Sequence, residues 1–287
     1  MERGCLTLRE ILKKHNFRYK KKWGQNFIFE QNLLQRIVTE AGIVPGDCVV
    51  EIGAGVGTLT RELLAQGAQV LAIEIDRTLL PLLASLFAEE NVVFVQGDVM
   101  QLDLDELTRA QGWSGYKVVA NLPYYITTPL VMKLLEEEAE IEDIVVMMQK
   151  EVAARLMAVP GTKEYGALTL AVQYYAEPEI LFPVSRHVFQ PVPQVDSAVI
   201  RLKPRKEPPV QVEDKALLFR IIKAAFGQRR KVLLNSLLKT HPGVEKKTLG
   251  EVLVQAGIDS RIRGEVLSLE QFAILSNIWV AKIKQMI

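Results

Sequence analysis

Short apolar runs alternate with amphipathic segments through the first two thirds of the chain. The apolar runs are rich in valine and isoleucine, as is typical of buried parallel strands, and they read CVVEIG, QVLAIEID, NVVFVQGD, YKVVANLPYY and IEDIVVMMQ. Most of them are followed by a segment with helical spacing, and a further helix is predicted before the first run, over residues 30–41. Strands that alternate with helices form βαβ units, so the pattern predicts a parallel sheet with right-handed crossovers.

The pattern changes near residue 204. The segment SAVIRLKP is predicted to be a last strand of the same sheet, and KPRKEPPVQVED is rich in proline and charge, as a domain linker is. Beyond it the spacing becomes helical in KALLFRIIKAAF, RRKVLLNSLLK, KKTLGEVLVQAG and SLEQFAILSNIWVAKIKQM. We therefore expect an α/β fold, with a Rossmann-like domain over residues 23–203 and a small all-helical domain over residues 204–287.

The charge is nearly balanced over the 287 residues, at +1, but it is unevenly distributed. Residues 1–22 contain eight Lys/Arg and two Asp/Glu, residues 23–203 contain twelve and twenty-four, and residues 204–287 contain fifteen and eight. An acidic block between basic ends favours a polyanion held by the ends of the chain, although solvated surface charge would give the same numbers. Residues 1–22 are accordingly predicted to form a basic N-terminal arm.

The composition argues against several classes of protein. Only two cysteines occur, Cys5 and Cys48, and no apolar run reaches the ~20 residues that span a membrane. The N-terminus is polar and basic, unlike a secretory signal. We expect a cytoplasmic, monomeric protein with no disulfide framework, no metal and no membrane partner.

A glycine turn follows the first predicted strand, in VVEIGAGVGTLT. Gly53, Gly55 and Gly57 allow a tight turn, and they let the backbone approach a ligand closely before a helix begins near Thr58. The dinucleotide fingerprint Gly-x-Gly-x-x-Gly is not met, because the third glycine comes one residue early. The turn alone is weak support for a ligand site.

The ends of the following strands sharpen this interpretation. Glu74 ends the second predicted strand, Asp98 follows the third, and Asn121 ends the fourth. Open parallel sheets bind ligands at the carboxyl ends of their strands. Acids suit hydroxyls, an exocyclic amine and a cationic centre but not a pyrophosphate, so the pattern favours S-adenosylmethionine over a dinucleotide. The alternative is that these acids are helix N-caps or ion-pair partners.

The tetrapeptide Asn-Leu-Pro-Tyr at residues 121–124 resembles the Asn/Asp-Pro-Pro-Tyr/Phe signature of enzymes that methylate an exocyclic amino nitrogen. The lone pair of adenine N6 is delocalised into the ring, so a site must draw this nitrogen toward a tetrahedral shape. The Asn121 side chain and the Leu122 carbonyl can accept its two hydrogens, Pro123 fixes the turn, and Tyr124 offers a ring on which a base stacks. The alternative is a proline turn with surface tyrosines.

These motifs together resemble the ribosomal RNA adenine dimethyltransferases, whose loss gives kasugamycin resistance. The resemblance covers nearly the whole chain through KKWGQNFI, VVEIGAGVGTLT, VLAIEID, GDVMQLDL, NLPYYITTPL, FQPVPQVDSAVIRL and AAFGQRRKVLLNSLL. It implies a class I methyltransferase sheet, S-adenosylmethionine as cofactor, and dimethylation of N6 at two adjacent adenosines. In that family these adenosines lie in a hairpin loop near the 3′ end of small-subunit rRNA, so the assembling small subunit is the expected partner.

The resemblance also implies roles for individual residues. Asn26 and Ile28 would close over the cofactor, and Gly53 and Gly55 would approach its methionine part. Glu74 would hold the ribose and Asp98 the adenine amine, with Asn121 where cofactor and target meet. Phe189 would be the second aromatic wall around a flipped base, opposite Tyr124, although core packing is its alternative role. The chain departs from the family pattern at Trp23, Ile28, Ala54 and Gln194, of which the first three keep an apolar character.

The helical domain carries a basic cluster, Arg229, Arg230 and Lys231, at the start of a predicted helix. Cations there oppose the helix dipole, so we interpret the cluster as an rRNA backbone contact, together with Lys246, Lys247, Arg261 and Arg263. Solvated helix faces remain the alternative.

Three other functions are open at this point. Macrolide-resistance methyltransferases perform the same chemistry on large-subunit rRNA, but their tetrapeptide is usually Asn-Ile-Pro-Tyr and they lack the GQRRK helix. A ribosome-assembly checkpoint would bind the small subunit and use methylation only for release. A dehydrogenase would bind nicotinamide.

Overall fold

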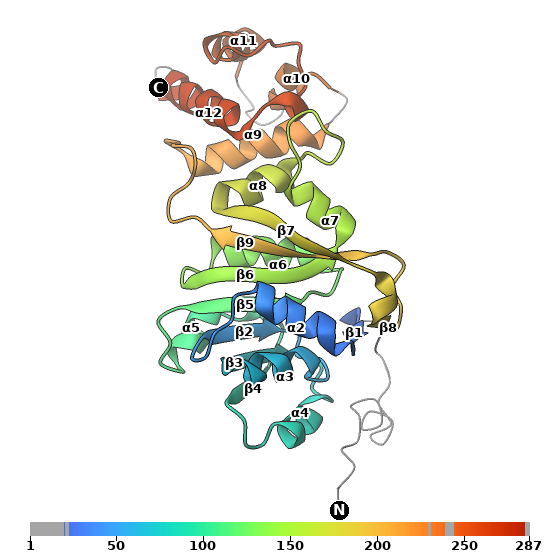
Figure 1. Cartoon of the computed structure of the whole chain (residues 1–287). Coiled ribbons are helices and arrows are strands. Elements are labelled where there is room, and N and C mark those ends of the chain that lie inside the picture. Colours follow the sequence, from blue (N-terminus) through green and yellow to red (C-terminus); the bar gives the residue numbers. More distant parts are fainter. Residues whose placement is uncertain (1–19, 21–22, 229–230, 239–243, 285–287) are drawn as a thin grey trace, which may run out of the picture. The chain divides into compact units, whose positions relative to one another are not determined.

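The computed structural model describes residues 20, 23–228, 231–238 and 244–284 (Figure 1). The chain divides into two compact units. The first contains the described residues up to 150 together with residues 179–203, and the second contains residues 151–178 and 204–284. The boundary between the units at residue 204 coincides with the expected linker. Residues 151–178, however, group with the helical unit, whereas the sequence pattern predicted them to belong to the domain of residues 23–203.

The first unit is built on a seven-stranded sheet with the order β4-β3-β2-β5-β6-β9-β7. Five strands run parallel to one another, and these are β2 (Cys48–Ile52), β3 (Gln69–Glu74), β4 (Val92–Gln96), β5 (Tyr116–Asn121) and β6 (Ile141–Gln149). β9 (Ser197–Pro204) pairs antiparallel with β6, and β7 (Ala176–Val184) lies at the edge beside β9. The chain runs outward from β2 to β4 and then returns to β5, so the topological switch point lies between β2 and β5.

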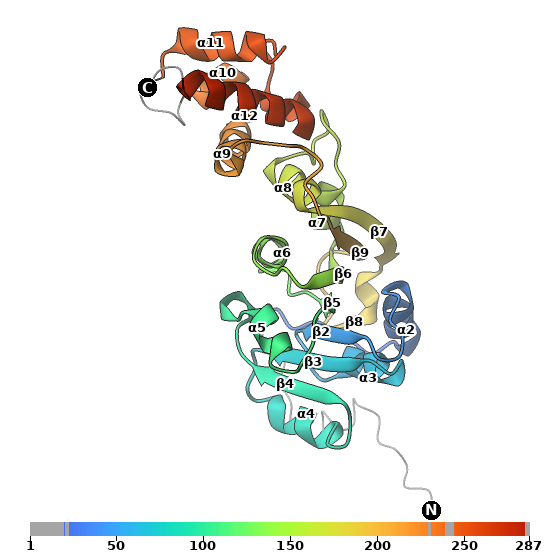
Figure 2. The ribbon, with the colours of Figure 1, turned by 90° about the vertical axis from the view of Figure 1, so that its left-hand side faces the viewer.

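Helices cover both faces of this sheet. Figure 2 shows α2 (Gln31–Glu40) and α3 (Thr58–Ala65) on one face, and α5 (Leu104–Arg109) and α6 (Thr127–Glu136) on the other. α4 (Leu80–Leu86) begins three residues later than the apolar pattern suggests, because Pro81 is accommodated only in a first helical turn. The β7 sequence AEPEILFPV holds two prolines, which suit an edge strand and hide its periodicity.

The second unit is helical. It contains α7 (Lys150–Leu156) and α8 (Ala167–Tyr175) from the middle of the sequence, with α9 (Lys215–Gly227), α10 (Leu233–Leu237), α11 (Lys246–Gln255) and α12 (Leu269–Lys284). Tyr165 and Leu170 belong to the same buried cluster as Phe272 and Trp279, which explains why residues 151–178 group with this unit. Within the described ranges, no helix is both long and apolar enough to cross a bilayer.

Candidate active site

The glycine turn lies at the switch point, directly after β2. Gly53, Gly55 and Gly57 all have positive φ, at 82°, 58° and 78°, a conformation that glycine adopts without strain. The amides of Gly53 and Ala54 both donate to the Ile73 carbonyl, at 2.8 and 3.1 Å, and so fix the turn to the end of β3. Gly53 and Gly55, which have no side chain, therefore present only backbone at this edge of the sheet.

Glu74 ends β3 beside this turn. Its carboxylate accepts hydrogen bonds from the backbone nitrogens of Gly55 and Asp76, each at 2.7 Å. The side chain is buried, and burial raises the pKa of Glu74 despite these bonds. The carboxylate is thus held rigidly, with lone pairs left for hydroxyl groups of a ligand.

The tetrapeptide follows β5, the strand next to β2. The Asn121 side-chain nitrogen donates to the Asn26 carbonyl at 2.9 Å, which leaves the side-chain oxygen to accept from a ligand. The Leu122 amide donates to Met147 of β6 at 3.1 Å, and the Thr127 hydroxyl donates to the Pro123 carbonyl at 3.1 Å. These bonds fix the turn in the way that its proline predicts.

Residues 23–28 form a strap across the same edge of the sheet. The strap ends in β1 (Phe27–Ile28), which pairs antiparallel with β8 (Phe189–Gln190), and Ile28 faces Phe189 in the register. A Cβ added at Gly55 would lie only 2.7 Å from the Phe27 ring. The Phe27 ring therefore packs directly against Gly55 of the glycine turn.

A polar clasp joins this strap to the loop after β3. Lys20 Nζ lies 2.7 Å from Asp76 Oδ1, and Gln25 Nε2 donates to Asp76 Oδ2 at 3.2 Å. The Lys20 amide also donates to Gln25 Oε1 at 2.8 Å. Burial alone would raise the pKa of Asp76, but the hydrogen bonds from Lys20, Thr78 and Gln25 outweigh it and lower that pKa below its ordinary value. Asp76 is thus an ionised anchor for the strap.

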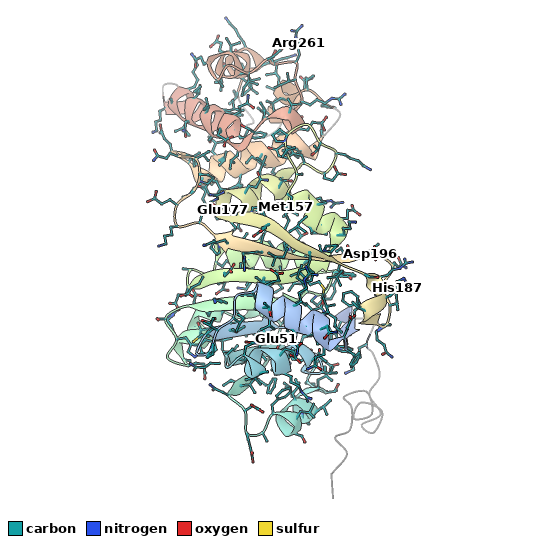
Figure 3. The ribbon with its side chains drawn as sticks, in the orientation of Figure 1. Glu51, Met157, Glu177, His187, Asp196 and Arg261 are labelled. Carbon is teal, nitrogen blue, oxygen red and sulfur yellow. The ribbon has the colours of Figure 1, made fainter. Side chains whose placement is uncertain are left out.

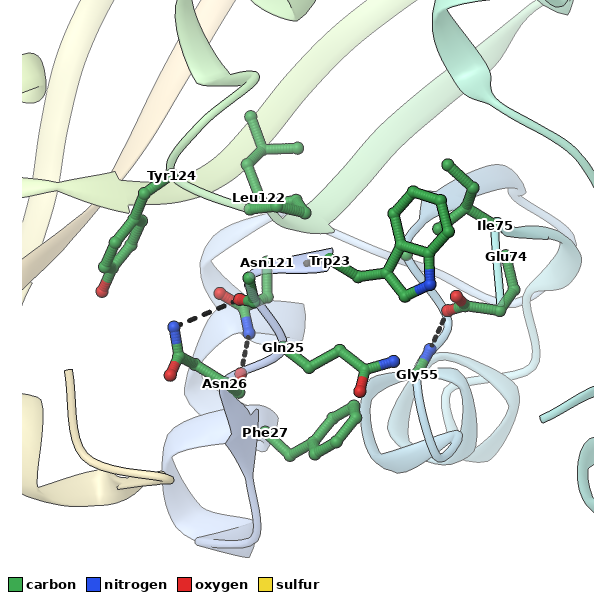
Figure 4. A pocket seen from close by; sticks show the side chains of 13 residues that line it. Trp23, Gln25, Asn26, Phe27, Gly55, Glu74, Ile75, Asn121, Leu122 and Tyr124 are labelled. Carbon is green, nitrogen blue, oxygen red and sulfur yellow. Dashed lines mark hydrogen bonds between the residues drawn. The ribbon is translucent and has the colours of Figure 1, made fainter. Parts of the chain in front are cut away.

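The strap leaves a cavity of about 70 Å³ between the glycine turn and the tetrapeptide. Figure 4 shows Trp23, Gln25 and Phe27 in the space between Asn121 and Glu74. Binding sites for drug-sized ligands enclose ~300–1,000 Å³, so this cavity is smaller than a site for a nucleoside cofactor. The cavity is lined by Trp23, Gly24, Gln25, Asn26, Phe27, Gly53, Gly55, Glu74, Ile75, Asn121, Leu122, Pro123 and Tyr124.

Most of the predicted site residues meet in this cavity, but three do not line it. Ile28 is buried in β1 beside it and lines a smaller neighbouring cavity. Asp98 caps the short helix η2 (Val99–Gln101), because its Oδ1 accepts from the Met100 amide at 3.0 Å. Phe189 is only 2% exposed and belongs to the same core cluster as Phe27, so its ring does not form an open wall here.

The predicted basic contacts are only partly described. Arg229, Arg230 and most of the N-terminal arm lie outside the described residues. Lys231 is exposed, as are Lys246 and Lys247. Arg261 and Arg263 are exposed but pair with Asp259 and Glu265, at 3.0 and 3.6 Å, which leaves them less charge for RNA.

Two features of the site were not predicted from the sequence. Glu51 in β2 is 1% exposed, receives a hydrogen bond from the Thr60 hydroxyl at 2.5 Å, and lines the smaller cavity with Gly53, Gly55 and Asn121. Burial raises the pKa of Glu51 to about 8. The one signal in the sequence that could have identified Glu51 is that an acidic residue occurs within the apolar run CVVEIG. The Tyr124 hydroxyl also lies 2.7 Å from the Ser197 hydroxyl.

Comparisons with known proteins agree with this geometry. The family model described as ribosomal RNA adenine dimethylase matches residues 16–277. The ribosomal RNA small subunit methyltransferase A of Geobacillus thermodenitrificans is 52% identical over 274 residues, 94% of each chain, and that of Clostridioides difficile is 47% identical over 277 residues, 96% of each. Among solved structures, a dimethyladenosine transferase from Plasmodium falciparum has a TM-score of 0.74 at 26% identity, covering 89% of this chain and 98% of that one. The 23S rRNA methyltransferase ErmE has a TM-score of 0.66 at 27% identity, covering 88% and 99%.

Proposed function

Because this chain belongs to the ribosomal RNA adenine dimethylase family, which uses S-adenosylmethionine, we propose that it dimethylates N6 of two adjacent adenosines in a hairpin loop near the 3′ end of small-subunit rRNA. Small-subunit methyltransferases of two bacteria are 47% and 52% identical to the chain over more than nine tenths of its length, which supports the small subunit as substrate. The observation that carries the proposal is Asn121, whose amide is held by Asn26 beside the glycine turn and Glu74.

The residues at the switch point fit a cofactor that carries a cationic centre and ribose hydroxyl groups. Among the described residues, Glu74 is the only one with a charged side chain that lines the larger cavity, and Glu51 lines the smaller one. Carboxylates suit a sulfonium and ribose hydroxyls, whereas a dinucleotide pyrophosphate needs donors or cations. We assign the methionine part to Gly53 and Gly55 and the ribose to Glu74, with Asn26 and Ile28 closing over both. These carboxyl groups thus argue against the dehydrogenase alternative, whose cofactor carries a pyrophosphate.

We assign the adenine amine of the cofactor to Asp98, whose side chain is half-buried and has one oxygen committed to the Met100 amide. Asp98→Ala is expected to weaken cofactor affinity about tenfold, because a charge-assisted hydrogen bond is lost. Calorimetry measures this directly. Asp103→Ala is the matched control, because Asp103 likewise caps a helix by accepting the Glu106 amide but lies outside the site. If Asp98→Ala and Asp103→Ala bound the cofactor with the same affinity, Asp98 would not be a cofactor-binding residue.

The chemistry assigned to the tetrapeptide is positioning. The bound cofactor supplies the methyl group. The Asn121 side-chain oxygen and the Leu122 carbonyl accept the two N6 hydrogens, which concentrates the lone pair on nitrogen for in-line attack. The nitrogen becomes acidic only after attack, so a strong base is not needed, and orientation and electrostatics lower the barrier. Tyr124 and Phe189 hold the flipped base, and Phe189 becomes available once β1 separates from β8.

Entry of the cofactor requires the strap to move, because the cavity holds about 70 Å³. Lys20→Met removes the cation from Asp76 and is expected to raise the cofactor association rate about tenfold, since a partly exposed charge-assisted bond must break during opening. Trp23 lines the cavity, so its fluorescence in stopped flow reports binding.

Lys117→Met is the matched control for this change, because Lys117 pairs with Asp47 at the same 2.7 Å away from the cavity. An association rate that is the same in wild type and Lys20→Met would show that the clasp does not limit entry.

The proposed partners are small-subunit rRNA and the assembling small subunit, which place the monomer in the cytoplasm. We assign the RNA backbone to Arg229, Arg230 and Lys231. Replacing all three with glutamine is expected to lower the slope of log affinity against log salt by about two to three, because each phosphate contact contributes ~0.7–0.9. Filter binding at several salt concentrations measures it. Neutralising Lys282 and Lys284, which pair with Glu251 and Glu213, is the control, and an unchanged slope in the triple variant would contradict the assignment.

Labelled methyl transfer tests the function itself. Undermethylated small subunits, large subunits and free rRNA are incubated in parallel with the protein and labelled cofactor, and the modified base is then mapped. Two dimethyladenosines in small-subunit rRNA are expected. Label in large-subunit rRNA would instead support the macrolide-resistance alternative.

A further inference from the structure

Ser197 occupies a distinctive place at the edge of the sheet. It is the first residue of β9, it is 0% exposed, and it pairs with Gln149 at the end of β6. Because β9 runs antiparallel to β6, its first residue lies at the edge where the parallel strands end. That edge carries Asn121, which pairs with Met147 of β6.

The Ser197 hydroxyl fixes the Tyr124 ring. The two hydroxyl oxygens lie 2.7 Å apart, although the residues are 73 positions apart in sequence. Burial raises the pKa of Tyr124, and Asp196 adds to this through its charge, so the phenol stays protonated and able to donate. A buried hydroxyl needs a partner, and here the partner also selects one orientation of the ring.

The preceding residue, Asp196, closes the loop that carries Phe189. Its Oδ1 accepts from the Arg186 amide at 3.0 Å, and its main-chain carbonyl accepts from the Lys150 amide at 3.0 Å. The Arg186 guanidinium adds a bond to the Gln194 carbonyl at 2.9 Å. Figure 3 labels Asp196 and His187, which both belong to this loop. The bond from the Arg186 amide to Asp196 therefore joins the two ends of the loop of residues 186–196, one residue before Ser197.

We propose that Asp196 and Ser197 are positioning residues that hold the two aromatic walls of the base site, Tyr124 through Ser197 and the Phe189 loop through Asp196. This inference rests on the proposed function. Asp196 and Ser197 are consecutive, and Ser197 is fixed in β9. The positions of both aromatic rings therefore depend on the start of this one strand. The spacing of the walls decides whether a flipped adenine presents N6 at Asn121, so the pair acts on the rate of transfer and not on cofactor binding.

The test separates the hydroxyl of Tyr124 from its ring. Tyr124→Phe keeps the stacking surface, so stacking alone predicts no effect. We expect Tyr124→Phe and Ser197→Ala each to lower kcat on small subunits about three- to tenfold, with unchanged cofactor affinity. The double variant should be no slower than the worse single variant, because both remove one shared bond. Ser276→Ala, equally buried in α12, is the control and should keep the wild-type kcat.

Asp196 is tested by a conservative pair. Asp196→Ala removes the acceptor for the Arg186 amide and should lower kcat by a similar factor, whereas Asp196→Asn keeps an acceptor oxygen and should restore it. The inference is overturned if Tyr124→Phe transfers at the wild-type rate, if its effect multiplies with that of Ser197→Ala, or if Asp196→Asn is as slow as Asp196→Ala. Failure of the wild type to methylate small subunits would instead overturn the proposed function.

Discussion

Asn121→Ala is expected to lower kcat for methyl transfer about 10²–10³-fold while cofactor affinity stays within a few fold. The variant removes the acceptor that we propose acts on the reacting amine, and loss of one preorganised hydrogen-bonding group, such as an oxyanion-hole donor, costs ~2.7–4 kcal/mol. The Asn26 carbonyl holds the Asn121 amide nitrogen at 2.9 Å, so the oxygen is oriented before the base arrives. Single-turnover rates on undermethylated small subunits measure the chemical step without product release.

Asn121→Asp separates the two roles of the amide. A carboxylate still accepts hydrogens from N6 but cannot donate to Asn26, so this variant is expected to keep at least about a tenth of the wild-type rate. An Asn121→Ala rate within threefold of wild type would contradict the assigned role. An alanine variant that loses methylation but still binds small subunits would show that binding is separable, as the checkpoint alternative requires.

The position of Asn121 could be predicted because it follows from local pattern and one topological rule. The apolar runs identified β2, β3 and β5, and parallel strands place Gly53, Glu74 and Asn121 at one edge. Family membership and cofactor agree with that interpretation. These inferences need only strand ends, which short-range periodicity supplies.

Features that depend on long-range packing were not accessible in this way. Burial of Phe189 results from pairing of β8 with β1, between segments more than 160 residues apart, and no periodicity encodes it. The clasp of Lys20 on Asp76 is of the same kind. Residues 151–178 group with the helical unit because Tyr165 and Leu170 pack there, although they precede the last strand in sequence.

Glu51 is expected to make the stability of the protein fall as pH rises from about 4.5 to about 8. Burial raises its pKa from 4.5 to about 8, so in this range the folded protein keeps a proton that the unfolded chain releases. The free energy of unfolding therefore decreases by up to ~1.4 kcal/mol per pH unit, or a few kcal/mol in all. Glu51→Gln cannot release a proton but still accepts from Thr60, so it should match wild type near pH 4.5 and exceed it near pH 8.

Urea unfolding across this range measures the effect, with Glu62→Gln of the adjacent helix α3 as the control for a buried carboxyl group. The same carboxyl lines the cavity beside Gly53 and Asn121, so a cationic ligand there favours its ionised form. Cofactor binding at pH 7 should then release a proton, seen as a calorimetric heat that depends on the ionisation enthalpy of the buffer. This dependence should vanish in Glu51→Gln. If Glu51→Gln released as many protons on binding as the wild type, and its stability depended on pH in the same way, the prediction would be wrong. Glu51 would then titrate in the same way in the folded and unfolded protein.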